Sequence, residues 1–113
     1  MQVDQRWLRL MAMRGSSGLW DETGGMLHPD ALRLSRPVCR RLARWCTWYD
    51  RYPDDQATLK FDYVKFSLEG RAIARAIKAE LPDWSVFYFD FGVALTTVLA
   101  DERELMSDEE IDG

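Results

Sequence analysis

The chain has 113 residues, of which 47% are hydrophobic and 12% aromatic, and its formal net charge is −4. This length fits one domain, and this apolar content excludes an intrinsically disordered chain. No stretch approaches the ~20 apolar residues of a membrane-spanning helix. The first residues lack the basic and apolar pattern of a secretory signal, so we expect a cytoplasmic protein. We expect residues 1–100 to form a single domain and residues 101–113 to form an acidic C-terminal tail.

The charged residues are distributed unevenly along the chain. Residues 36–52 hold five arginines and one acid, a net charge of +4. Residues 83–113 hold nine acids and one arginine, a net charge of −8. The sequence therefore predicts one basic helix and one acidic C-terminal region on an otherwise neutral body.

The N-terminal third predicts a strand followed by a long loop. Residues 6–14 predict a strand in which small and apolar side chains alternate with Trp7, Arg9, Met11 and Met13 on the other face. Residues 15–34 contain four glycines and no clear periodicity, which predicts a loop. A loop of this length is usually functional or packed down by its own side chains. We expect this one to be anchored by Trp20, Leu27 and Leu32.

The first helix is predicted from Ser35 to about residue 51. Ser35 can accept a capping hydrogen bond, and Pro37 fits the first turn, where no N–H is needed. Apolar residues at spacings of three and four predict the buried side, which consists of Val38, Leu42, Trp45, Cys46 and Tyr49. The opposite side carries Arg36, Arg40, Arg44 and Arg51.

The second helix is predicted from a cap at Asp62 to Leu81. Gly70 lies within its apolar stripe, where glycine costs about 1 kcal/mol relative to alanine. We therefore expect another backbone to approach this helix closely at Gly70.

The C-terminal part predicts two strands and a polar end. Residues 84–89 are apolar or aromatic on both faces, which predicts a central strand. Residues 93–100 predict a partner strand, although their spacing also permits a helix. Residues 107–110 are expected to be frayed or to form a final capped turn. The order strand, loop, helix, helix, strand, strand predicts an α+β fold with both helices on one face of a small mixed sheet.

Catalytic, metal and cofactor motifs are not recognised in the sequence. In a helix, Cys39 and Cys46 would lie about 10.5 Å apart, too far for a disulfide, so we expect two reduced thiols. His28 is the single histidine and cannot complete a zinc site. No motif links it to a nucleophile and an orienting group, so we predict a protein that is not an enzyme.

The residues with the strongest case for binding another protein are two tryptophans and the acids near them or near the C-terminus. An exposed tryptophan is a frequent anchor of protein interfaces, and clustered acids attract basic partners. The candidates are Trp20, Asp21, Trp48, Asp90, Asp101, Glu102, Glu104, Asp108, Glu109 and Glu110.

Five segments of the sequence carry a resemblance to known proteins: Leu19–Asp21, Pro29–Ser35, Phe66–Ala74, Glu80–Trp84 and Phe87–Asp90. Together they resemble a family of small bacterial proteins that look like the immunity proteins of toxin systems. The resemblance covers about residues 6–90 and implies a fold and a binding role, without established catalytic or binding residues.

We therefore predict a protein that binds and neutralises another protein, as an immunity protein or inhibitor does, through an acidic and aromatic surface. The partner is expected to carry a basic surface, as a toxin or a nucleic-acid-handling complex would, and no membrane is involved. One alternative is a small enzyme or ligand-binding domain that uses residues 15–34, with Asp21 and His28 as participants. Another is nucleic-acid binding by the helix arginines, which a pI near 4.9 disfavours.

Overall fold

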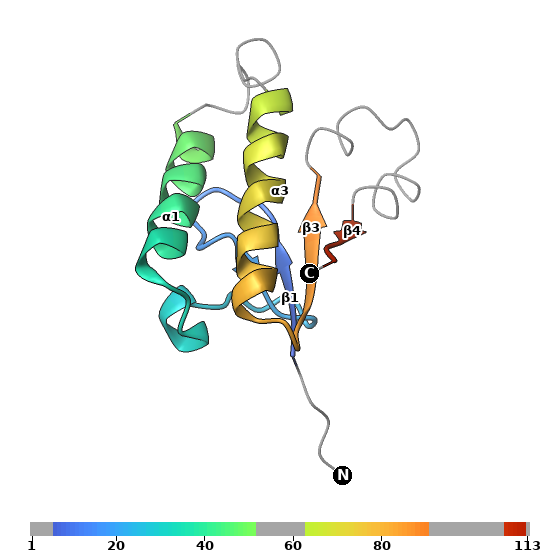
Figure 1. The fold of residues 1–113 in the computed structure, drawn as a ribbon. Coiled ribbons are helices and arrows are strands. Elements are labelled where there is room, and N and C mark those ends of the chain that lie inside the picture. The colour runs from blue at the N-terminus through green and yellow to red at the C-terminus, as the bar shows by residue number, and fades with distance from the viewer. Residues whose placement is uncertain (1–5, 52–62, 91–107, 113) are drawn as a thin grey trace.

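The computed structural model describes residues 6–51, 63–90 and 108–112 (Figure 1). It contains four strands, two α-helices and one short 3-10 helix among these residues. In chain order they are β1 (Trp7–Leu10), β2 (Leu19–Trp20), η1 (Pro29–Leu32), α1 (Arg36–Asp50), α3 (Tyr63–Glu80), β3 (Ser85–Phe89) and β4 (Asp108–Glu110).

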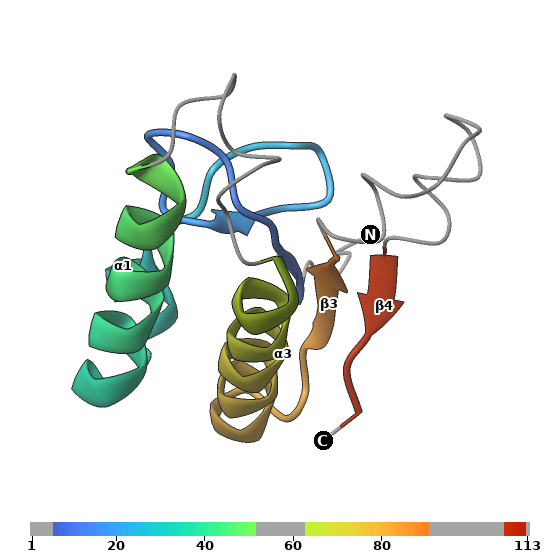
Figure 2. The same cartoon turned by 90° about the horizontal axis from the view of Figure 1, so that it is seen from above.

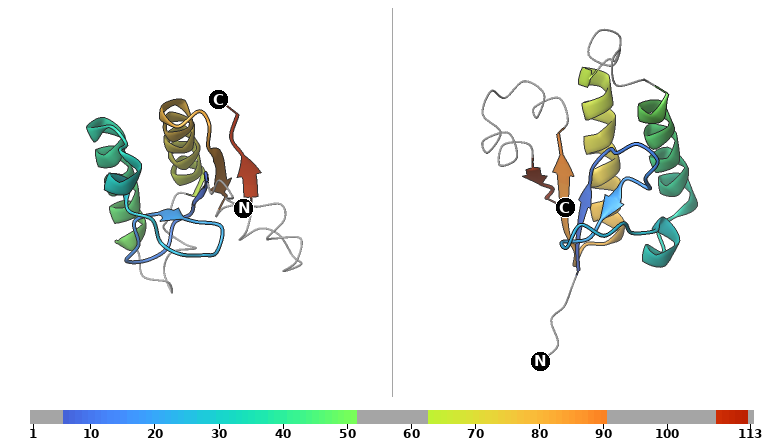
Figure 3. Two further views of the ribbon diagram at one scale, coloured as in Figure 1. Left: turned by 90° about the horizontal axis from the view of Figure 1, so that it is seen from below. Right: turned by 180° about the vertical axis from the view of Figure 1, so that it is seen from behind.

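The strands form one mixed sheet in the order β2-β1-β3-β4. The central pair, β1 and β3, is parallel, whereas β2 and β4 are antiparallel to their neighbours. A parallel pair needs a long crossover connection, and the two helices supply it. Both helices lie on the same side of the sheet (Figures 2 and 3), which confirms the predicted α+β fold.

The alternation of side chains along the strands divides the sheet into two faces. One face lies under the helices, and its four central side chains are fully buried: Leu8, Leu10, Val86 and Tyr88. We call the opposite face of the sheet the open face. Its side chains on the two central strands are half-buried: Trp7, Arg9, Phe87 and Phe89.

Helix α1 begins as its sequence predicts. The Ser35 side chain accepts a hydrogen bond from the Val38 N–H, and proline stands in the first turn. On the predicted buried side, Trp45 is 1% exposed, stacks on the Phe66 ring at 4.5 Å and donates from Nε1 to the Phe66 carbonyl. This stack joins α1 to α3 at the centre of the core.

Residues 15–34 contain more regular structure than the loop prediction allowed. They include β2 and η1, and Leu19 of β2 is fully buried. Leu27 and Leu32 pack against the core, as expected of anchors. The Trp20 side chain instead lies on the open face, because Leu19 takes the inward position of this short strand.

At Gly70 a side chain, that of Tyr88, packs closely against α3, and not another backbone as we predicted. A Cβ atom at this position would lie 2.6 Å from the Tyr88 ring and hydroxyl. The glycine therefore allows the tyrosine of β3 to lie flat against α3.

The prediction for residues 107–110 was wrong over Asp108–Glu110, which form β4 and pair with β3. The neighbouring Ile111 is 4% exposed, and its N–H donates to the Val86 carbonyl. The predicted strand at 93–100 and the cap at Asp62 lie outside the described residues, so the domain boundary at residue 100 stays a prediction. Within the described segments, no helix has the length and apolarity needed to span a membrane.

Candidate functional site

The strand registers bring four side chains from distant parts of the sequence into one line on the open face. Arg9 of β1 is paired with Trp20 of β2 on one side and with Phe87 of β3 on the other. Phe87 in turn is paired with Glu110 of β4. Paired residues of neighbouring strands point to the same face. We call this line the open-face row: Trp20, Arg9, Phe87 and Glu110.

Ring contacts and a hydrogen bond hold the aromatic members of this surface in place. The rings of Trp7 and Phe87 lie 5.3 Å apart, and the Arg9 guanidinium lies 5.6 Å from the centre of the Trp7 ring. Trp20 donates from its indole nitrogen to the Met11 carbonyl at 3.0 Å. These contacts fix the side chains before any partner arrives, which lowers the entropic cost of binding.

A hollow of about 390 Å³ opens on this face between β1 and the turn that follows β2. Met13 lies at its margin and is 48% exposed. A surface that exposes aromatic rings and methionines together is typical of protein-binding sites. The side chains and backbone that line the hollow belong to Trp7, Arg9, Met11, Met13, Trp20, Asp21, Glu22, Thr23 and Gly24.

Asp21 shapes the turn at the edge of the hollow. Its Oδ1 accepts hydrogen bonds from the Thr23 hydroxyl at 2.7 Å, the Gly25 N–H at 2.8 Å and the Thr23 N–H at 2.9 Å. These donors, the Thr23 hydroxyl first, lower the pKa of the Asp21 carboxyl below its ordinary value of 3.8. The next residue, Glu22, is exposed and also lines the hollow, to which it brings a negative charge.

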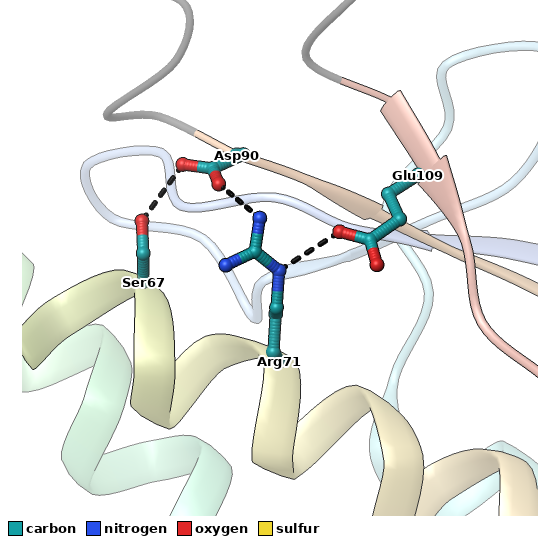
Figure 4. A network of polar contacts seen from close by, with 4 residues as sticks. All are labelled: Ser67, Arg71, Asp90 and Glu109. Carbon is teal, nitrogen blue, oxygen red and sulfur yellow. Dashed lines mark hydrogen bonds and ion pairs between the residues drawn. The ribbon is translucent and has the colours of Figure 1, made fainter. Parts of the chain in front are cut away.

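A second polar cluster joins α3 to the C-terminal strands (Figure 4). Arg71 donates from Nη2 to Asp90 at 2.6 Å and from Nε to Glu109 at 2.8 Å. Ser67 donates to the other oxygen of Asp90, which is only 5% exposed. Asp90 and Glu109, both predicted to bind a partner, therefore make contacts within the molecule. The ion pair between Arg71 and Glu109 joins β4 to α3 and so helps to position Glu110.

The outer side of α1 forms a separate, basic surface. We call it the α1 arginine face, and all four of its arginines are exposed. Trp48 lies beside it, half-buried, with its ring edge-on to Phe66 at 5.3 Å. Trp48 also lines a shallow hollow of about 340 Å³ with Arg44 and Arg51. The arginines of this face are Arg36, Arg40, Arg44 and Arg51.

The structure does not bring Asp21 and His28 together as an enzyme would require. The hollow that contains Asp21 does not include His28, which is exposed. In residues 6–51, 63–90 and 108–112, no three His, Cys, Asp or Glu side chains are grouped so as to hold a metal ion. Cys39 and Cys46 are thiols, and burial raises the pKa of Cys46 to about 11, which leaves it protonated and unreactive.

Three further predicted residues, Asp101, Glu102 and Glu104, lie outside the described residues, and Asp108 is described only as part of the β4 backbone. Of the side chains gathered on the open face, the candidates predicted from the sequence included Trp20 and Glu110. They did not include Trp7, Arg9 and Phe87. The alternation in residues 6–14 did place Trp7 and Arg9 on one face. Only the pairing of β1 with β3 shows that this face lies away from the helices and that Phe87 lies on it.

The family model described as Serratia CdiI immunity protein-like matches residues 6–91, which span every described element except β4. This match confirms the resemblance drawn from the sequence. Among curated proteins, none matches the chain.

Proposed function

The chain belongs to the Serratia CdiI immunity protein-like family, and on this premise we propose that it binds a toxin protein and neutralises it without catalysing a reaction. The family match is the observation that carries the proposal. An immunity protein needs a surface that recognises its toxin and a fold that holds this surface rigid. The open face meets both requirements, since it presents half-buried aromatic side chains on a hydrogen-bonded sheet.

We infer that the toxin is bound through an acidic and aromatic surface and that it carries basic side chains at the contact. Support comes from the net charge of −4 and from the exposed carboxylates of Glu22 and Glu110 near the open-face row. Opposite charges on two partners speed their encounter and fix their orientation. The Glu109 carboxylate contributes indirectly, because its ion pair with Arg71 joins β4 to α3, and Asp90 pairs with the same arginine.

Co-expression tests the proposal directly. Candidate toxins from the genes that neighbour the gene of this chain are each expressed in a sensitive bacterium with and without this chain, and growth is recorded. We expect the chain to restore growth and to copurify with the toxin. Asp30→Asn is a suitable control because Asp30 is exposed on η1, away from the open face, and it should protect as well as the wild type. Absence of both protection and complex, at equal expression, would overturn the proposal.

Nucleic-acid binding by the α1 arginine face is the second candidate, favoured by one observation. Four arginines are exposed along one side of α1, whereas Arg41 of the same helix is paired with Glu69 at 2.8 Å. A gel shift with single- and double-stranded oligonucleotides at 50 mM and 200 mM salt tests it. Specific involvement of this face requires binding that falls with salt and is lost in Arg40→Gln/Arg44→Gln.

A further inference from the structure

We propose that the open face binds a segment of the toxin in which an apolar side chain lies between two basic side chains. This inference rests on the proposed function and specifies where and how the toxin is recognised. The apolar side chain would enter the hollow beside Trp20 and Arg9. One basic side chain would meet Glu22, in the turn beyond Trp20, and the other would meet Glu110, the last member of the open-face row.

The centre of the surface has the composition of an interface anchor. Trp7 and Trp20 line the hollow together with Arg9, and tryptophan and arginine are the residues that most often dominate binding energy. A hollow of about 390 Å³ has room for a large side chain of the partner. The Trp7 and Trp20 rings and two methionines form the apolar part of its wall, where an apolar side chain would gain about 25 cal/mol per Å² of buried surface. The rest of the wall is polar and includes Arg9, Asp21 and Glu22.

Negative charge lies at Glu110, the last member of the row, and at Glu22, in the turn beyond Trp20. Glu22 and Glu110 are both exposed, and neither makes an ion pair with any residue in the described segments. Three strand spacings separate β2 from β4, a distance of about 14 Å. Glu110 lies on β4 and Glu22 in the turn that follows β2, so a lysine or arginine on each side of the apolar residue would meet one of these carboxylates.

The α1 arginine face is positively charged, so the two faces differ in the kind of partner that they attract. The α1 arginine face would attract an acidic partner, whereas the carboxylates of Glu22 and Glu110 would attract a basic one. A partner bound by one face is therefore disfavoured by the other, and exchanging charges on each face separates the two modes of binding.

The experiment takes the toxin identified by the co-expression test, inactivated by substitution, and measures its binding by titration calorimetry at low and high salt. Trp20→Ala removes the wall of the hollow, and we expect its affinity to fall about 30-fold. Glu22→Gln/Glu110→Gln removes two exposed carboxylates without disturbing the core, and we expect about a 10-fold loss at 50 mM salt that shrinks at 500 mM. Asp30→Asn and Arg40→Gln/Arg44→Gln serve as controls and should stay within about twofold. Circular dichroism verifies that each variant is folded.

The outcomes separate this inference from the proposed function. If Glu22→Gln/Glu110→Gln and Trp20→Ala bind like the wild type while Arg40→Gln/Arg44→Gln loses affinity, the open face is not the site, although the chain is still a toxin-binding protein. If the wild-type chain neither binds nor protects, the proposed function itself fails. If affinity falls only in Trp20→Ala and Glu22→Gln/Glu110→Gln, the result supports both the open-face site and the proposed function.

Discussion

The two faces of the sheet are built from alternating residues of the same strands, yet they differ in what they contribute. On the inner face, Leu8 and Val86 are fully buried beneath α1 and α3. On the open face, their neighbours Trp7 and Phe87 are equally apolar but only half-buried. The inner face therefore carries most of the stability. The open face keeps apolar surface available for another molecule, and it is held in shape by the strands that the inner face stabilises.

Overpacking the inner face should give the largest effect. Gly70→Leu adds a side chain where the Tyr88 ring already lies 2.6 Å from the Cβ position. We expect it to destabilise the fold by about 4 kcal/mol or more, measured by urea unfolding. Leu68→Ala, at a position of α3 that is 60% exposed, should change stability by less than about 0.5 kcal/mol. Equal effects at both positions would contradict the packing described for Gly70.

Truncating one apolar side chain on each face of the sheet compares how much the two faces contribute to stability. Leu8→Ala leaves a cavity at a fully buried position and should cost about 3 kcal/mol. Phe87→Ala removes a half-buried ring from the open face and should cost about 1 kcal/mol, although it should weaken toxin binding more than Leu8→Ala does in the folded state. Thermal unfolding and calorimetry measure the two quantities. The distinction between the faces breaks down if Phe87→Ala is the more destabilising change.

Arg71 connects the helix layer to the strand that carries Glu110. Arg71→Met removes the ion pair that Arg71 makes with the buried Asp90 carboxylate and releases Glu109, at an expected cost of about 2 kcal/mol. Hydrogen exchange of the β4 region should rise, and the Ile111 N–H, bonded to the Val86 carbonyl, is a suitable reporter. Arg75→Met, on the exposed side of the same helix, is the matched control. Unchanged exchange at Ile111 would show that β4 does not depend on Arg71.

Acid titration of Asp21 should give the smallest effect. Hydrogen bonds from Thr23 and Gly25 hold its pKa below 3.8, so its charged form is favoured in the folded state. The resulting stabilisation is complete above the unfolded pKa and is lost as the pH falls through the lower folded pKa. NMR titration of the carboxyl carbon should show a midpoint below 3.8, and Thr23→Ala should raise it. A midpoint above 3.8 in the wild type would remove the role assigned to Asp21 in the turn.

The helices and the central strands were predictable because local sequence and tertiary packing agree there. Ser35 caps α1, its apolar positions recur at helical spacing, and residues 85–89 favour a strand by composition. The acidic β4 was missed because Asp and Glu disfavour strands. It forms through tertiary contacts, namely the ion pair from Arg71 to Glu109 and the burial of Ile111.

The candidate site was only partly predictable for the same reason. Trp20 and Glu110 attract notice as single residues in the sequence. Their alignment with Arg9 and Phe87 depends on the parallel pairing of β1 with β3, which joins residues nearly 80 positions apart. Long-range pairing of this kind leaves no periodic signal in the sequence, and only the assembled sheet shows it.

This wide separation also has a consequence for protein synthesis. Strand β1 leaves the ribosome first, but its parallel neighbour follows only after both helices, and contacts so distant in sequence form slowly. A nascent chain that ends before residue 110 contains all of α1 and α3 yet lacks the last member of the row. If the open-face row binds the toxin as proposed, the chain becomes competent to bind only after Glu110 has been synthesised, and a product truncated before it would contain both helices and still give no protection.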